Sequence, residues 1–274
     1  MPDAAPDASS AAPDATASDA TAASPPLEAE HLTLAYGSFV IMRDLTFQIE
    51  KGEIFIIMGG SGSGKSTLMK HLMGLLEPSD GIVRFEGNDL SDPDVQEAMR
   101  QRMGVLYQRN ALWSSMTLAE NLALPLNEYT DLTESDIRRV VSLKLALVGL
   151  RGFESFYPHE ISGGMQKRAA LARAIALDPD VLFFDEPSSG LDPVSARRLD
   201  DLILQLRDSL DTTIVVVTHD LASIFTIADR ALFLDIETKT MSALGPPDDL
   251  RDNPPNDRVY HFMTRTTENT DPET

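Results

Sequence analysis

The chain has 274 residues, of which 42% are hydrophobic, so it can bury one sizeable core or a core with a subdomain. It contains no cysteine, which excludes disulfides, thiolate catalysis and zinc held by cysteine. The net charge of −20 disfavours nucleic acid as a partner and direct docking on anionic lipid, because both depend on attraction to negative phosphate groups.

The first 27 residues are predicted to form a disordered acidic tail. They are almost wholly Ala, Asp, Ser, Thr and Pro, with no aromatic residue and no apolar period. They lack the basic start and apolar stretch of a secretory signal, and no run in the chain approaches the roughly 20 apolar residues of a membrane span. We expect a folded domain over residues 28–250 and a C-terminal extension over 251–274.

Two stretches after the tail alternate apolar and polar residues, as antiparallel strands do. They cover residues 31–36 and 40–49, with Gly37 and Ser38 between them. The first stretch ends in Tyr36, ahead of a glycine-rich loop. An aromatic ring there could stack on adenine, or it could simply be a core residue at a strand end.

The glycine-rich loop follows the apolar run 54–58 and precedes a helical pattern over 68–76. Its G-x-x-x-x-G-K-S spacing predicts phosphate binding, because glycines let successive backbone N–H groups point inward and the helix N-terminus adds partial positive charge. Lys65 can reach the β- and γ-phosphates, and the Ser66 hydroxyl can hold Mg²⁺. The expected nucleotide-binding residues are Gly59, Gly60, Ser61, Gly62, Ser63, Gly64, Lys65, Ser66 and Thr67.

Two later strands are predicted to end in single polar residues that could face the same phosphates. A strand over 104–107 ends in Gln108, which could coordinate Mg²⁺ or orient water. A buried strand over 213–217 leads to His219, which could bond the γ-phosphate. A lone Gln is usually surface and a lone His is more often structural, so each interpretation depends on its context.

A pair of acids gives a stronger indication. Residues 181–184 are four apolar residues in a row, as in a central parallel strand, and Asp185 and Glu186 follow them. Asp185 could bind Mg²⁺ through water, and Glu186 could polarise an attacking water. Two adjacent carboxylates after a fully buried strand are costly without a cation, which favours the functional interpretation.

The sequence predicts a second anion-binding helix end. Ser162 is a good N-cap, and Gly163 and Gly164 free the backbone at the start of its helix. Asp192 caps another helix, which begins at Pro193. Further helices are expected over 93–103 and within 116–150, a hairpin or two short strands over 230–243, and a short apolar patch over 259–263.

In this order, the features resemble the nucleotide-binding subunits of ABC transporters over about residues 28–250. The resemblance implies an α/β fold of the P-loop NTPase type, with a RecA-like core, an antiparallel β subdomain and a helical subdomain over about 109–170. Met165 departs from the family, which usually has Gln there. The matching pieces are Tyr36, the Walker A loop 59–67, Gln108, the signature 162–166, the Walker B pair Asp185 and Glu186, the loop 189–192, and His219.

The resemblance also implies an ATPase mechanism with ATP and Mg²⁺. Two copies of the chain would sandwich two ATP molecules head to tail, with Ser162 of one copy meeting the γ-phosphate bound by Lys65 of the other. Glu186 would be the general base, and His219 would position the γ-phosphate and water. The resemblance adds Gly163, Gly164 and Asp192 to the nucleotide-binding set, and Ser66, Gln108 and Asp185 to the metal set.

Finer resemblances point to one subfamily. The run NALWSSMTLAENLALPL (110–126), the SGGM signature and the helix RAALARAIALDPD (168–180) look like ATPases of MCE-type (mammalian cell entry) transporters, such as the Mla-type system. Those systems move phospholipids between bacterial inner and outer membranes. The implied partners are a permease, an MCE-domain protein and, in some complexes, a STAS-domain protein, at the cytoplasmic face of the inner membrane. Residues 253–263 resemble a C-terminal extension that reaches the neighbouring ATPase.

Other functions remain open at this point. Within transport, the alternatives are an ATPase for amino acid import or for lipoprotein release. Outside transport, ABC-type ATPases serve DNA repair and chromosome condensation. Those proteins carry long coiled-coil or zinc insertions, whereas the interval between residues 67 and 162 is compact and cysteine-free.

Overall fold

The computed structural model describes residues 24–266. Most of the predicted tail, residues 1–23, and the last residues of the C-terminal extension, 267–274, lie outside them. Leu27 is a correction, because we expected it in the tail. It is fully buried and is the first residue of strand β1 (Leu27–Tyr36), so the folded domain includes it.

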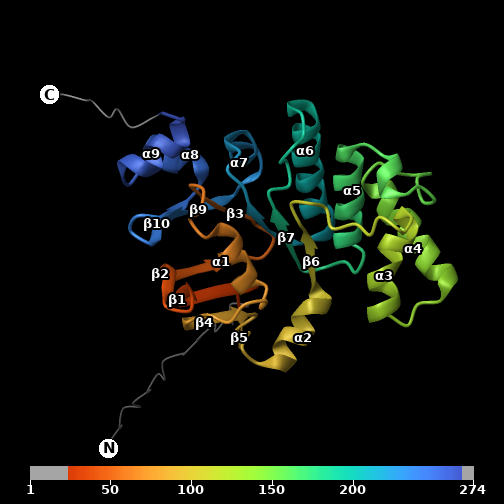
Figure 1. The fold of residues 1–274 in the computed structure, drawn as a ribbon, viewed down its shortest axis with the longest axis horizontal. Coiled ribbons are helices and arrows are strands. Elements are labelled where there is room, and N and C mark those ends of the chain that lie inside the picture. The colour runs from red at the N-terminus through yellow and green to blue at the C-terminus, as the bar shows by residue number, and fades with distance from the viewer. Residues whose placement is uncertain (1–23, 267–274) are drawn as a thin grey trace, which may run out of the picture.

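The predicted antiparallel sheet is present. Its four strands lie in the order β2-β1-β4-β5 and are drawn in red and orange in Figure 1. The alternation in the sequence buries one face of β1, whose residues Ala29, Leu32 and Leu34 are inaccessible to solvent. The strands that pair with β1 directly or through a neighbour are β2 (Phe39–Ile49), β4 (Asp80–Phe85) and β5 (Asn88–Asp89).

A second sheet of six strands forms the centre of the molecule, in the order β10-β9-β3-β8-β7-β6. Neighbouring strands are parallel except β10 and β9, which form the predicted hairpin. The bounds are β3 (Ile54–Gly59), β6 (Met103–Leu106), β7 (Val181–Asp185), β8 (Thr213–Val217), β9 (Arg230–Asp235) and β10 (Thr240–Gly245). Because β3, β7 and β8 are buried on both faces, they are continuous apolar runs.

Helices cover both faces of the central sheet. Alternate residues of β3 enter two different cores, with Phe55 facing α1, α2 and the antiparallel sheet and Ile56 facing the helices from α3 onward. Helices α3 to α5 form a separate group at the right of Figure 1. The helices are α1 (Lys65–Leu72), α2 (Pro93–Arg102), α3 (Leu118–Tyr129), α4 (Glu134–Leu147), α5 (Gly163–Ala174), α6 (Pro193–Leu210), α7 (Leu221–Ile227), α8 (Pro247–Asp252) and α9 (Asp257–Thr264), with a 3₁₀ turn, η1 (Pro158–Glu160).

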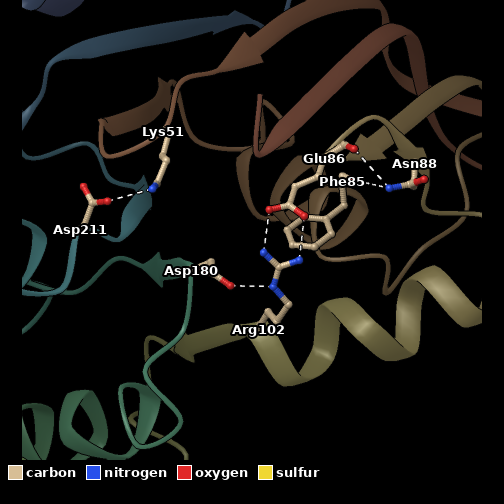
Figure 2. Close-up of polar contacts among 7 residues, drawn as sticks. All are labelled: Lys51, Phe85, Glu86, Asn88, Arg102, Asp180 and Asp211. Carbon is tan, nitrogen blue, oxygen red and sulfur yellow. Dashed lines mark hydrogen bonds and ion pairs between the residues drawn. The ribbon is translucent and has the colours of Figure 1, made fainter. Parts of the chain in front are cut away.

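An ion-pair cluster joins the two sheets at the end of the central sheet where its strands begin. Figure 2 shows Arg102, at the end of α2, donating to both carboxylate oxygens of Glu86 at 2.6 and 2.7 Å and to Asp180 at 2.7 Å. These hydrogen bonds raise the pKa of the guanidinium, first through Glu86. The cluster holds the antiparallel sheet against the end of the central sheet where its strands begin. The predicted phosphate loop lies at the other end, so these ion pairs stabilise the fold without entering the site.

A buried carboxyl group connects α6 and α7, the helices that follow the predicted site residues Asp192 and His219. Asp200 of α6 is 4% exposed and accepts a hydrogen bond from Ser223 of α7 at 3.0 Å. Burial raises its pKa from 3.8 to about 6. The folded state therefore binds a proton more tightly than the unfolded chain, so this group's contribution to stability is present below the unfolded pKa and is lost as pH rises through the folded one.

We expect Asp200→Asn to remove this pH dependence. Through Asp200, the wild-type chain should lose about 1.4 kcal/mol of unfolding free energy between pH 5 and pH 8, whereas an amide cannot ionise. Urea unfolding of both chains at the two pH values measures the difference. Equal losses in wild type and variant would show that Asp200 is ionised throughout this range.

Candidate functional site

The topology of the central sheet brings the predicted catalytic loops together. Strand β8 lies between β3 and β7, and all three run in the same direction, so their carboxyl ends meet at one edge. A cavity of about 700 Å³ opens at that edge. The predicted residues that line it are Gly59, Gly60, Ser61, Gly62, Lys65, Ser66, Gln108, Asp185, Glu186 and His219.

The glycine-rich loop needs glycine at its two ends. At Gly59, where φ is 147°, an added Cβ would lie 2.6 Å from the Leu234 carbonyl oxygen and 2.8 Å from Ser63 Oγ. At Gly64, where φ is 86°, it would lie 2.7 Å from a methyl carbon of Ile41. The spacing of the motif therefore follows from close approach of the backbone, as a loop that wraps a phosphate requires.

Lys65 is held inside the loop. Its Nζ donates to the carbonyl oxygens of Gly59 at 3.0 Å and Gly60 at 2.8 Å. Burial lowers the pKa of Lys65, and the negative charges of Glu186 and Asp185 oppose that shift. The loop thus presents one ammonium group and the first N–H groups of α1 to the cavity, an arrangement suited to a polyphosphate.

Oxygen atoms that could coordinate Mg²⁺ face the same cavity. Ser66 Oγ donates to Asp185 Oδ1 at 3.2 Å, and Gln108 lines the wall. Within residues 24–266, no group of three or more His, Cys, Asp or Glu side chains could hold a metal by itself. A hydroxyl and one carboxylate fit Mg²⁺ bound together with substrate phosphates and water, because Mg²⁺ takes few protein ligands.

Glu186 and His219 form a hydrogen-bonded pair at the strand ends. Glu186 Oε1 lies 2.7 Å from His219 Nδ1, and the Glu186 side chain is 14% exposed against 69% for His219. The backbone of Glu186 has a φ of 48°, a left-handed conformation that costs a non-glycine residue about 1–3 kcal/mol. Its N–H donates to the Val217 carbonyl at 2.8 Å, so the neighbouring strand β8 fixes this acid at the cavity.

Tyr36 lies on the other side of the phosphate loop. It lines a hollow of about 430 Å³ together with Phe39, Ile41, Thr67 and parts of the loop. Tyr36 is 55% exposed, so it is not the core residue of the alternative interpretation. A nucleotide whose phosphates occupy the loop can reach this aromatic surface with its base.

The structure separates the signature residues from this cavity. Ser162 caps α5 by accepting from the Met165 N–H at 3.3 Å, and Ser162 and Gly164 line a different cavity of about 480 Å³. Gly163 follows Ser162 at the start of α5. Asp192 caps α6 and accepts from the N–H groups of Val194 and Ser195. Hydrogen bonds from Ser195, first from its side chain and then from its N–H, lower the pKa of Asp192. The two helix ends that the sequence predicts to bind anions therefore face two different cavities.

The sequence analysis missed the end of α9 and the two residues after it, which complete the first cavity. His261, Phe262, Arg265 and Thr266 also line it. Phe262 packs edge-on against Phe233 of β9, with ring centroids 5.2 Å apart. The sequence showed a short apolar patch over residues 259–263, but nothing in it indicated the surface that they cover. We expected this extension to reach a neighbouring subunit, and in the single chain it packs against β9.

The comparisons with known proteins agree with this geometry. The family described as "ABC transporter" matches residues 42–189. The intermembrane phospholipid transport system ATP-binding protein MlaF of Haemophilus influenzae is 46% identical over 211 residues, which cover 76% of this chain and 80% of that protein. The probable ribonucleotide transport ATP-binding protein mkl of Mycobacterium tuberculosis is also 46% identical, over 74% of this chain and 57% of its own length. This chain therefore spans little more than half of mkl.

A solved structure shares the fold. It is the dimeric, post-hydrolysis state of the ATP-binding cassette MJ0796 bound to ADP and Pi, which is 27% identical with a TM-score of 0.72. The likeness covers 80% of this chain and 98% of that one. Within residues 24–266, no helix is long and apolar enough to cross a membrane.

Proposed function

The chain belongs to the ABC transporter family, and from that premise we propose that it is the ATP-hydrolysing subunit of an MCE-type phospholipid transporter. The observation that carries the ATPase assignment is the Glu186–His219 pair in one cavity with Lys65, Ser66 and Asp185. The extended similarity to a phospholipid-transport ATPase supports the substrate class.

Each residue has a role that follows from its position. The loop N–H groups and Lys65 bind the β- and γ-phosphates of ATP. Glu186 takes a proton from the attacking water, and His219, hydrogen-bonded to it, orients that carboxylate. Ser66, Gln108 and Asp185 would hold Mg²⁺, which when bound neutralises charge on the phosphates. The products are ADP and phosphate.

The site is complete only in a pair of chains. Ser162, Gly163, Gly164 and Asp192 lie outside the cavity that holds Lys65, and the dimeric form of MJ0796 supports an arrangement in which they serve a second copy. In this proposal residues 28–250 are the ATPase domain, 109–170 its helical subdomain and 251–274 the extension. Contacts made only in the nucleotide-bound pair would drive its closure.

A candidate docking surface for the membrane partner surrounds Trp113, which follows Gln108 closely in the sequence. Trp113 is 60% exposed and lines a hollow of about 300 Å³ with Pro125, Tyr129 and Arg173. Arg173 donates to the Ala111 carbonyl oxygen at 2.7 Å, which fixes the segment that carries the indole. An exposed aromatic in a shaped hollow suits a helix of a permease. The permease would hold the chain at the cytoplasmic face of the inner membrane, with an MCE-domain protein and a STAS-domain protein as further partners.

A second substrate class rests on the similarity to mkl, whose name specifies ribonucleotide transport. The deciding experiment is to purify the intact complex from membranes through a tag on this chain and to identify its proteins by mass spectrometry. A permease together with an MCE-domain protein would support phospholipid transport. A permease with a different solute-binding protein would keep the ATPase and overturn the substrate, and the absence of any membrane protein would overturn transport itself.

Deleting residues 253–274 tests the extension. The deletion removes α9, whose Val259 and Met263 are buried, and exposes Phe233 beside the phosphate cavity. We expect weaker pairing of chains in the presence of ATP, measured by gel filtration of the Glu186→Gln protein with and without the deletion. Deleting the acidic residues 2–23 is the matched control and should leave pairing unchanged. Equal pairing of all three proteins would show that the extension does not contribute to the pairing of chains.

A further inference from the structure

The C-terminal extension supplies one wall of the phosphate cavity. His261, Phe262, Arg265 and Thr266, at the end of α9 and just after it, line that cavity of about 700 Å³ together with Lys65 and the phosphate loop. In Figure 1 the extension is blue, where α8 contacts β10, and Phe262 of α9 packs on β9. The residues assigned to ATP hydrolysis all belong to the other walls, so this wall has no role yet.

An ion pair fixes α9 next to the phosphate loop. Arg258 donates to Asp235 Oδ2 at 2.7 Å, and Asp235 is 2% exposed and is the last residue of β9. The preceding residue, Leu234, is the one whose carbonyl oxygen would meet a Cβ at Gly59. Val259, which follows Arg258, is fully buried. The end of α9 is therefore held at the cavity by the same strand that packs against the phosphate loop.

The cavity has a second permanent cation. Within residues 24–266, Lys65 and Arg265 are the lysine and arginine side chains of its lining, and Asp185 and Glu186 are the acids. A nucleoside triphosphate would add several negative charges to those two carboxylates, more than Lys65 and a Mg²⁺ ion neutralise. Because opposite charges attract strongly in a partly enclosed site, another cation beside the phosphates would stabilise the bound nucleotide.

The guanidinium of Arg265 is available to a ligand. Its one printed partner is Asp220, whose Oδ1 lies 3.7 Å from Nη2, which is too long for a hydrogen bond. The same carboxylate oxygen already accepts from the Ala222 N–H at 3.1 Å. The Arg265 side chain is 68% exposed, so it can turn without disturbing the core. Phosphate oxygens are the acceptors that arginine binds through paired hydrogen bonds.

The position of Arg265 selects one end of the nucleotide. Tyr36, the expected contact of the base, lines a separate hollow that Arg265 does not reach. Arg265 lines the cavity of Glu186 instead, and its partner Asp220 directly follows His219 in the chain. The guanidinium therefore lies toward the end of the site where the terminal phosphate would be attacked.

We propose that Arg265 is a further nucleotide-binding residue, a second cation that the C-terminal extension supplies to the γ-phosphate of ATP bound in the same chain. The inference rests on the proposed ATPase function. On binding, the guanidinium turns from Asp220 to the γ-phosphate oxygens, and it returns when phosphate leaves. His261 Nδ1 lies 2.9 Å from Thr266 Oγ1, a contact that fixes the backbone just beyond Arg265.

The test compares the affinities of ATP and ADP for single chains. Full-length Ser162→Arg protein serves as the parent, because it should neither hydrolyse ATP nor complete a shared site, and gel filtration verifies that it is a monomer. Adding Arg265→Ala should weaken ATP binding by about tenfold and leave ADP binding unchanged, since ADP has no γ-phosphate. Arg265→Lys should restore part of the loss, because the ammonium group keeps the charge but not the paired hydrogen bonds.

Arg251→Ala is the matched control. Arg251 is an arginine of the same extension that pairs with Asp248 and Asp252 and does not line the cavity, so neither affinity should change. Thermal midpoints check that each variant is folded.

The ratio of the two affinities decides the proposal. A selective loss of ATP binding in Arg265→Ala supports it. Unchanged affinities, or equal losses for ATP and ADP, would overturn it. Unchanged affinities together with weaker ATP-dependent pairing of the Glu186→Gln protein would also overturn it, because Arg265 would then contact the second copy. A parent protein that binds neither nucleotide would instead overturn the ATPase function, and the role of Arg265 with it.

Discussion

Replacement of Glu186 with Gln is expected to lower ATP hydrolysis by the assembled complex by about 10²–10⁴-fold while ATP binding is retained. The amide keeps the shape of the side chain, but it cannot accept a proton from water. The amide oxygen can still accept a hydrogen bond from His219 Nδ1, so the orientation of the group is kept and the lost base accounts for the effect. Phosphate release measures the rate, and equilibrium binding of labelled ATP measures affinity.

The same substitution should trap the pair of chains. Because the contacts of the closed pair depend on an intact γ-phosphate, slow hydrolysis lengthens its lifetime, and gel filtration with ATP should show a stable dimer. Glu134→Gln is the control, since Glu134 lies on the exposed face of α4 and its side chain is 91% exposed. Wild-type turnover of the Glu186→Gln complex would show that another group acts as the base.

Sequence patterns predicted those residues of the site that directly follow a strand. An apolar run of four or five residues followed by polar ones predicts a buried parallel strand and places the polar ones at its carboxyl edge, as for Asp185 and Glu186 after β7. The order of such strands in the sheet remained open in the sequence. The structure supplies it, with β8 between β3 and β7.

Contacts between residues far apart in the chain could not be predicted in this way. Arg102 is separated by 16 residues from Glu86 and by 78 from Asp180, and no periodicity indicates that it joins them. The burial of Lys167 is a similar case, because a lysine one turn into a polar helix start ordinarily reaches solvent. Tertiary packing decides both, and local patterns carry no information about it.

The proposed site shared between two chains leads to the other large expected effect. Lys65→Ala and Ser162→Arg should each abolish hydrolysis. The first removes the cation at the phosphates, and the second places a long charged side chain at the start of α5. Because Lys65 and Ser162 line different cavities of one chain, the head-to-tail pair predicts that the two inactive chains complement each other.

Mixing the two inactive chains therefore tests the arrangement itself. Random pairing makes half of the dimers mixed, and each mixed dimer has one site with an intact Lys65 and an intact Ser162 and one site with neither. If single sites work independently, the mixture should recover about a quarter of the wild-type rate of phosphate release. Each variant assayed alone at the same total concentration is the control.

A mixture as inactive as its components would have two explanations. Either both sites must turn over together, or Ser162 serves its own chain. Two chains linked in tandem, with both substitutions confined to one half, separate these cases. The head-to-tail pair leaves each site of such a linked protein with one defect, so the protein should be inactive. Hydrolysis by its unsubstituted half would contradict a shared site.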